Sequence, residues 1–222
     1  MSSLLDAATR YVRPDHRMVG IADAVAATAQ ESVVPGEDFL GVNPNEILIA
    51  TGQDGMDVHL RLEAWDGPPP PPRDHELSET TGIDLPTGQV CIDLTLRGWI
   101  PEVLELPPGH YQARITAWDR TRIKDLYWEV GSRTGFDPGN TEFAALRAGS
   151  HGHQRYLVQL WKLGDINPEP AQPEEPEAED TMGTTTAPAP RRRSATRPQQ
   201  PLPAPPPSLD DMLERERKHP RQ

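Results

Sequence analysis

The chain has 222 residues but only one cysteine, Cys91. A single thiol excludes a disulfide within the chain and any zinc site built from several cysteines. No segment approaches the roughly 18 apolar residues that cross a bilayer. The first residues also lack the basic segment and apolar stretch of a signal peptide. We therefore expect a cytoplasmic protein with no membrane association.

Tryptophan, tyrosine and phenylalanine are absent from residues 165–222, which nevertheless hold 13 of the 26 prolines. A segment with so little apolar surface cannot offset the entropy of ordering its backbone. We expect a folded domain that ends at Gly164. A disordered linker should follow over 165–207, acidic at first and then basic and proline-rich, with a short helix-prone peptide over 208–218.

Basic side chains are scarce in the expected domain. The net charge of the chain is -12, and residues 1–164 carry 14 basic against 23 acidic side chains. Such a surface repels phosphate backbones and suits a basic partner, so we expect no nucleic-acid binding through this domain. The chain has 19 arginines and three lysines, a bias consistent with a GC-rich bacterial genome.

Residues 1–36 are predicted to form a helical or irregular segment. Met18, Ile21, Val25 and Thr28 recur at helical spacing within 17–30, and Pro35-Gly36 would end the helix. The apolar face is narrow and rich in alanine, so this helix would pack on the domain or mediate a contact.

From residue 45 the apolar period changes to two, which is typical of half-buried strands. Residues 37–164 are therefore predicted to form an antiparallel β-sandwich or open barrel. Residues 67–72 (GPPPPP) cannot join a sheet and should form an exposed, semi-rigid crossing. A polar loop is predicted over 119–125, with a further strand over 126–130. The main strands are expected at 46–52, 57–65, 89–97, 110–118 and 155–163.

The sequence lacks the common catalytic motifs, including the P-loop, the dinucleotide-binding glycines and the HExxH zinc motif, and we predict no cofactor. Ser150 has Gly152 on one side but Ala148 on the other, so it does not fit a nucleophile elbow. His151 and His153 have a spacing that lets both imidazoles point the same way. A metal site would need further ligands, such as His59, His110 or Asp119; otherwise the pair belongs to a loop before a strand.

Cys91 and Asp93 are predicted to share one face of a strand. A neighbouring carboxylate raises the pKa of a thiol, so we expect a packed and unreactive cysteine. Paired carboxylates for hydrolysis could come from Asp84, Asp93, Glu102 and Glu105, but such pairs occur in any acidic domain.

Trp65 and Trp118 end predicted strands with the opposite parity from the apolar positions. Each should therefore lie outside the main core, either at a binding surface or under a second layer such as the N-terminal helix.

The end of the chain suggests a peptide ligand. Ser208 can cap a helix over 208–218 whose apolar anchors are Leu209, Met212 and Leu213. So short a helix forms best on a partner. The basic cluster 191–193 would alternatively fold back on the acidic domain, or the tail would simply be solvated.

The stretch Leu106–Leu163 contains Pro107-Pro108-Gly109 before one predicted strand, Trp118-Asp119-Arg120 after it, and Tyr156-Leu157-Val158-Gln159-Leu160-Trp161 near its end. In these features it resembles an uncharacterised family of small β proteins common in actinobacterial genomes. The resemblance covers about a quarter of the chain and implies a β-sandwich with no assigned activity. Gln112 departs from the arginine that this pattern favours. At the level of the fold, the chain also distantly resembles the small inhibitor of a competence nuclease.

The leading hypothesis is a non-enzymatic protein-binding module, with an immunity or inhibitor role against a basic nuclease or toxin as one form. Trp65, Trp118, Leu209, Met212 and Leu213 are its candidate contact residues. The alternatives are a metal-dependent hydrolase using His151 and His153, and a structural component of a phage or other assembly.

Overall fold

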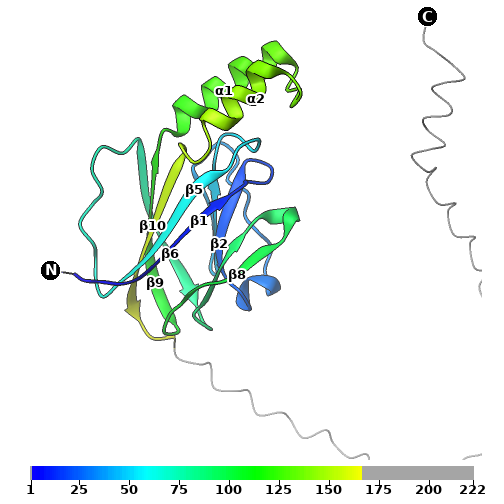
Figure 1. Ribbon diagram of the computed structural model, residues 1–222. Coiled ribbons are helices and arrows are strands. Elements are labelled where there is room, and N and C mark those ends of the chain that lie inside the picture. The colour runs from blue at the N-terminus through cyan, green and yellow to red at the C-terminus, as the bar shows by residue number, and fades with distance from the viewer. Residues whose placement is uncertain (1, 167–222) are drawn as a thin grey trace, which may run out of the picture. The chain divides into compact units, whose positions relative to one another are not determined.

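The computed structural model describes residues 2–166, and these form a β-sandwich of two five-stranded sheets (Figure 1). Sheet A has the order β1-β5-β10-β9-β6, and sheet B the order β3-β4-β2-β7-β8. The strands are β1 Leu4–Val12, β2 Met18–Asp23, β3 Leu40–Asn43, β4 Glu46–Ala50, β5 Val58–Trp65, β6 Leu77–Leu85, β7 Gln89–Asp93, β8 Trp99–Glu105, β9 Gly109–Trp118 and β10 Arg155–Gly164.

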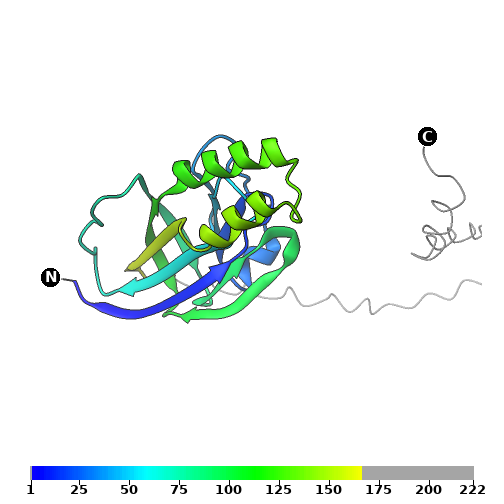
Figure 2. The same cartoon turned by 45° about the horizontal axis from the view of Figure 1, so that its top comes forward.

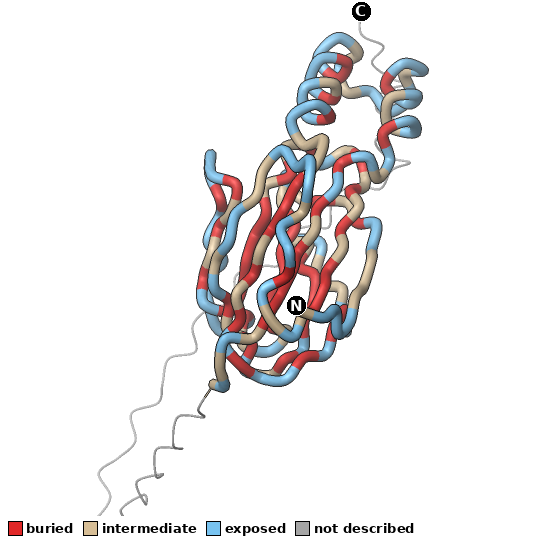
Figure 3. Tube along the Cα trace, turned by 90° about the vertical axis from the view of Figure 1, so that its left-hand side faces the viewer, coloured by how far each residue is buried: buried red, intermediate tan, exposed pale blue. Residues whose placement is uncertain are grey.

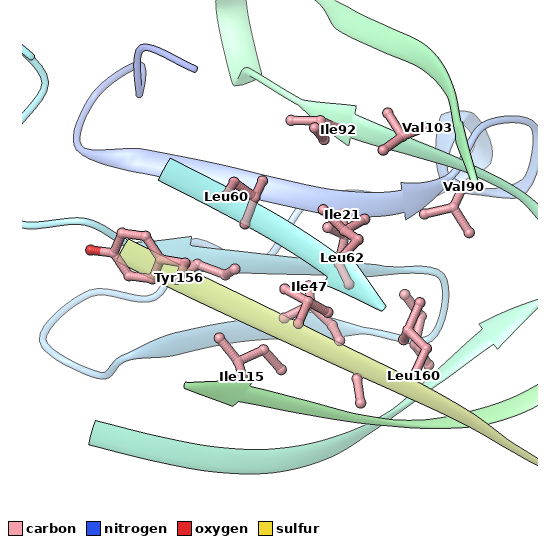
Figure 4. Close-up of a cluster of buried hydrophobic side chains, with 14 of the residues drawn as sticks. Ile21, Ile47, Leu60, Leu62, Val90, Ile92, Val103, Ile115, Tyr156 and Leu160 are labelled. Carbon is pink, nitrogen blue, oxygen red and sulfur yellow. The ribbon is translucent and has the colours of Figure 1, made fainter. Parts of the chain in front are cut away.

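The period-two pattern correctly predicted five of the ten described strands, β4, β5, β7, β9 and β10. Alternate side chains of β5, β9 and β10, such as Leu62, Ile115 and Leu160, meet side chains of sheet B, such as Ile21 and Ile47, between the sheets (Figure 4). All five are fully buried, and the buried positions follow the strands through the middle of the sandwich (Figure 3). Burial of this apolar surface is the main force that holds the two sheets together.

The pairing is antiparallel except at the centre of sheet A, where β10 runs parallel to β5 and antiparallel to β9. The last described strand therefore lies between β9, the strand before it in the chain, and β5, from much earlier. Within residues 2–166 the two sheets do not close into a barrel.

The predicted N-terminal helix is wrong. Residues 4–12 and 18–23 are strands β1 and β2, and the only helical turn among residues 2–36 is the short 3-10 segment η1, Ala26–Ala29. The helical spacing of Met18 and Ile21 competes with an alternation in which Ile21 points into the core. Pairing of β2 with both β4 and β7 satisfies the backbone of the strand and decides the outcome.

The predicted loop at 119–125 and the strand at 126–130 are also wrong, because residues 120–130 lie in helix α1, Arg120–Thr134, which Asp119 precedes. Helix α2, Thr141–Gly149, follows, and the Asn140 side chain caps it by accepting from the backbone N–H groups of Glu142 and Phe143. The two helices pack side by side at one end of the sandwich (Figures 1 and 2). Neither they nor the other helical turns of residues 2–166 are long and apolar enough to cross a membrane.

Residues 66–76 connect β5 to β6 across the outside of sheet A, at the left of Figure 1. The predicted polyproline crossing is present, but it is not wholly exposed. Pro69 is buried, and its carbonyl oxygen accepts a hydrogen bond from Arg114 of β9 at 3.1 Å. We call residues 66–76 the polyproline strap.

Candidate functional site

The outer face of sheet B carries side chains that are buried although they point away from the core. Gly20 of β2 pairs with Leu48 of β4 on one side and with Asp93 of β7 on the other. All three are buried, because residues 24–36 lie over this face. We call residues 24–36 the covering segment.

Hydrogen bonds and one close contact hold the covering segment in place. The Asp23 carboxylate, at the end of β2, accepts from the backbone N–H groups of Val25 and Ala26. Burial raises the pKa of Asp23, but the hydrogen bonds outweigh this effect and leave that pKa below its usual value. Further along, a Cβ atom at Gly41 would lie 1.7 Å from the carbonyl oxygen of Val33, so glycine alone permits this approach.

Between the covering segment and the β7–β8 turn lies a cavity of about 540 Å³, here called the acidic cavity. Its volume falls within the roughly 300–1,000 Å³ typical of ligand pockets. Most of its lining is apolar and comes from Met18, Ala27, Val34, Leu48, Leu96 and Trp99.

Two carboxyl groups, those of Glu46 and Asp93, line the acidic cavity although they are only 2% and 5% exposed. Burial and the neighbouring Asp93 carboxylate raise the pKa of Glu46 to about 7, against smaller opposing effects of hydrogen bonds from Ser32 and Asn43. Asp93 accepts a hydrogen bond from the backbone N–H of Thr95 at 2.7 Å. Neither carboxyl forms an ion pair within residues 2–166. The pair can therefore hold one proton between two carboxyls, or balance the charge of a cation.

The mouth of the acidic cavity is formed by two turns with unusual backbone angles. His16 and Arg17 have φ values of +49° and +63°, and Thr95 has +52°. The Asp15 carboxylate joins the turns, because it accepts from the Thr95 hydroxyl at 2.9 Å and from the Leu96 N–H at 3.1 Å. Non-glycine residues persist in this left-handed region only where surrounding contacts fix them, which is common at binding sites.

The second of these turns exposes Leu96, which lies in the strand predicted over 89–97, where the period of two would point it into the core. Strand β7 ends at Asp93, so Leu96 does not continue its inward alternation, whereas Leu94 is partly buried against the core. Leu96 is 84% exposed, and Val34 and Trp99 are 64% and 36% exposed beside the same cavity. We call Val34, Leu96 and Trp99 the apolar rim.

A second cavity, of about 510 Å³, adjoins the first and shares His16, Met18 and Val34 with it. Its other lining residues include Arg17, Arg120 and Lys124. The Arg120 Nε donates to the carbonyl oxygen of Ala50 at 2.8 Å. The cleft over sheet B is therefore acidic at one end and basic at the other.

The predicted contact residues Trp65 and Trp118 lie on sheet A, on the outer face that their parity indicates. The Trp65 indole donates to Glu63 at 3.0 Å, and the Trp118 indole donates to the carbonyl oxygen of Arg73, in the polyproline strap, at 3.2 Å. Both are half-buried, whereas Trp99 and Trp128 are exposed. The layer that covers Trp118 includes the strap, and within residues 2–166 no N-terminal helix covers either residue. Leu209, Met212 and Leu213 lie outside the described residues.

On the outer face of sheet A, the Glu63 carboxylate is the common acceptor of a hydrogen-bond network within the domain. Its buried carboxylate accepts from Arg61 at 2.8 Å, from Trp65 at 3.0 Å and from Gln159 at 3.0 Å. Burial raises the pKa of Glu63, but these hydrogen bonds outweigh burial and leave that pKa below its usual value.

The histidines proposed for a metal site are not arranged to bind one metal ion; His59 and His151 instead each pack against the Tyr11 ring. His151 stacks on Tyr11, with ring centroids 5.2 Å apart, and lies 3.5 Å from the Asp57 carboxylate. Asp119 pairs instead with Arg122 and Arg155. Over residues 2–166 no group of three or more His, Cys, Asp or Glu side chains is arranged to hold a metal ion.

Cys91 is buried, and burial followed by the charges of Asp93 and Asp23 raises the pKa of its thiol to about 12. A thiol with this pKa is almost entirely protonated at neutral pH, which makes it a poor nucleophile. Of the other carboxylates considered, Asp84 pairs with His110 at 2.6 Å. Glu102 and Glu105 are exposed on β8.

The pairing of Glu46 with Asp93 was not predicted. Asp93 was considered as half of a carboxylate pair, but Glu46, 47 residues earlier, was not. The signal for Glu46 was a carboxylate at the start of the otherwise apolar run of β4. Its neighbour could be found only from the order β4-β2-β7 in sheet B.

No family model and no curated protein matches the chain. Two solved structures are similar to it. One is ComJ from Bacillus subtilis, an inhibitor of the DNA-degrading activity of NucA, with a TM-score of 0.48 and 9% identity over 73% of this chain and 99% of ComJ. The other is described as crocagin biosynthetic gene J, with a TM-score of 0.44 and 15% identity over 71% of this chain and 97% of that one. These scores are too low to transfer a function, and the resemblance to the actinobacterial family stays a prediction.

Proposed function

We propose that this chain is a protein-binding module that docks a basic partner over the cleft on the outer face of sheet B. The observation that carries the proposal is the apolar rim, Val34, Leu96 and Trp99, exposed around a cavity with two buried carboxyls. Exposed apolar clusters beside a pocket are typical of binding surfaces, and aromatic anchors near a pocket often dominate binding energy.

The distribution of exposed apolar side chains favours this face over the others. The described residues expose ten large apolar side chains, and five of them belong to the covering segment, the β7–β8 turn or the start of β8. These five are Val25, Val33, Val34, Leu96 and Trp99. A solvated surface without a partner would scatter such residues singly.

The charge of the domain indicates the class of partner. With 23 acidic and 14 basic side chains in residues 1–164, the domain attracts a basic protein and accelerates its association at low salt. Inhibition of a basic nuclease or toxin is one form of this function that we propose. The peptide anchors Leu209, Met212 and Leu213 are proposed as a second, tethered contact.

The function is tested by affinity capture from the native host with the full chain and three variants. We expect wild type to retain a basic protein and the double variant Val34→Asp, Leu96→Asp to lose it. Leu5→Asp is the matched control, because Leu5 is 66% exposed on β1, in the other sheet, and should retain the partner. Replacement of Leu209, Met212 and Leu213 by serine tests the tail. Equal capture by wild type and the rim variant, or no capture by either, would refute docking at this cleft.

A further inference from the structure

Resting on this function, we infer that the acidic cavity receives one lysine or arginine side chain of the docked partner, with the carboxyl pair Glu46 and Asp93 as its counter-charge.

The first support is that the two buried carboxyls of the cavity have no cation beside them. Two carboxyls more than nine-tenths buried would normally be paired with a cation, because burying a bare charge is costly. Glu63, on the other sheet, has Arg61 for this purpose, at 2.8 Å. Glu46 and Asp93 have no such partner within residues 2–166, and they line a cavity large enough for a side chain from outside.

The second support is the chemistry of the walls. A lysine or arginine has an apolar stem and a charged end, and buries the stem along apolar surface while the end seeks a polar group. Met18, Leu48 and Leu96 line the cavity along such a route. Trp99 adds an aromatic ring, which attracts a cation approaching its face.

The third support is that the mouth of the cavity is held in shape before any partner arrives. Asp15 links the two turns through Thr95 and Leu96, and Gly41 lets the covering segment lie directly on β3. A preformed pocket spends little free energy on ordering when it binds.

Binding of a cation should release a proton from the carboxyl pair. With its pKa near 7, Glu46 holds a proton at lower pH, and an incoming ammonium or guanidinium favours the ionised pair, so this proton leaves to solvent. Binding should therefore strengthen as pH rises toward 7 and level off above it. The other titratable groups around the pair are His16 and Asp15 at the mouth, and Cys91 and Asp23 beneath the covering segment.

The test uses the full chain and four small probes: N-acetyl-lysine methylamide, its arginine counterpart, and the uncharged norleucine and citrulline counterparts. Binding is followed by NMR through the indole N–H of Trp99, with the indole of Trp65 as the reference for non-specific effects. We expect saturable shifts of Trp99 with the cationic probes, and at least tenfold weaker binding of the uncharged ones. In the double variant Glu46→Gln, Asp93→Asn this preference should disappear, together with the pH dependence between about 5 and 7.

A second pair of variants serves if the buried substitutions impair folding. Leu96 is exposed, so Leu96→Lys and Leu96→Gln should both fold. The lysine supplies a tethered ammonium at the mouth and should weaken binding of the lysine probe several-fold more than glutamine does. Equal effects of the two variants, equal binding of lysine and norleucine probes, or no shift of Trp99 would overturn the inference.

The outcomes also separate this inference from the function on which it rests. If the partner is lost by the rim variant but kept by Glu46→Gln, Asp93→Asn, docking stands and the cationic side chain does not. If the rim variant keeps the partner, the proposed function fails whatever the probes do.

Discussion

The two outer faces of this sandwich each bury a glutamate, and the two glutamates are treated in opposite ways. On sheet A, Glu63 accepts three hydrogen bonds under the polyproline strap, and its pKa is lowered. On sheet B, Glu46 faces a second carboxyl in an apolar cavity, and its pKa is raised. A face whose charge is neutralised by the chain itself has a structural role. A face that buries two carboxyls without a cation of its own is suited to bind a cationic group of a partner.

The largest expected effect on stability comes from removing the Glu63 carboxylate on sheet A. Glu63→Ala leaves the buried Gln159 amide and the half-buried Trp65 indole without their acceptor, and removes the partner of Arg61. We expect a loss of about 3–4 kcal/mol in the free energy of unfolding at pH 7, measured by urea denaturation. Because the pKa of Glu63 is lowered, its contribution exists above its unfolded pKa and is lost as pH falls through the folded value. A loss below 1 kcal/mol would contradict the network.

Removing the Glu46 carboxylate on sheet B should instead stabilise the protein above pH 7. The folded protein holds the Glu46 proton up to pH about 7, whereas the unfolded chain releases it near 4.5. Wild type should therefore lose on the order of 3 kcal/mol of stability, through this group, as pH rises from about 4.5 to 7. Glu46→Gln should remove this loss and be the more stable protein above pH 7. Denaturation curves of both proteins from pH 5 to 8 check the prediction, and parallel profiles would refute it.

A smaller effect is expected from the contact that closes the cleft. Gly41→Ala places a methyl group 1.7 Å from the Val33 carbonyl oxygen, so the covering segment must move. We expect a cost of about 2 kcal/mol and faster hydrogen exchange over residues 31–36. The control is Gly82→Ala on β6, where the added methyl group meets only the Tyr111 carbonyl oxygen, at 3.9 Å. The comparison fails if both variants behave alike.

The smallest effect on stability is expected at Leu96, a residue of the apolar rim that is proposed to bind the partner. Leu96→Asp changes a side chain that is 84% exposed, so the free energy of unfolding should stay within about 0.5 kcal/mol of wild type. Calorimetry of this variant and of Leu5→Asp is the measurement. A substantial destabilisation would mean that Leu96 packs within the domain and is no rim residue.

The sandwich was predictable because each central strand has an apolar residue at every second position, as in Leu60, Leu62 and Ala64 of β5. The N-terminal strands were not, since Ile21 fits a helical spacing with Met18 as well as a strand alternation with Val19. The α1 helix was missed although Ile123, Tyr127 and Val130 have helical spacing, because polar residues divide its short apolar stretches.

The candidate site was less predictable than the fold. Cys91 was correctly placed in a packed position beside Asp93. The proximity of Asp93 to Glu46, however, depends on β2 lying between β4 and β7, and no local pattern reports that order. The exposed Leu96 was misplaced because the alternation of β7 stops where Thr95 adopts a positive φ.

The position of β10 in sheet A has a consequence for folding during synthesis and for truncated chains. Strands β1 and β5 can pair with each other as soon as they exist, as can β6 and β9, but the two pairs are joined only by β10. A chain that stops before Arg155 leaves β5 and β9 as open edges, which are sites for aggregation. Sheet A is therefore complete only when the last described strand has been added.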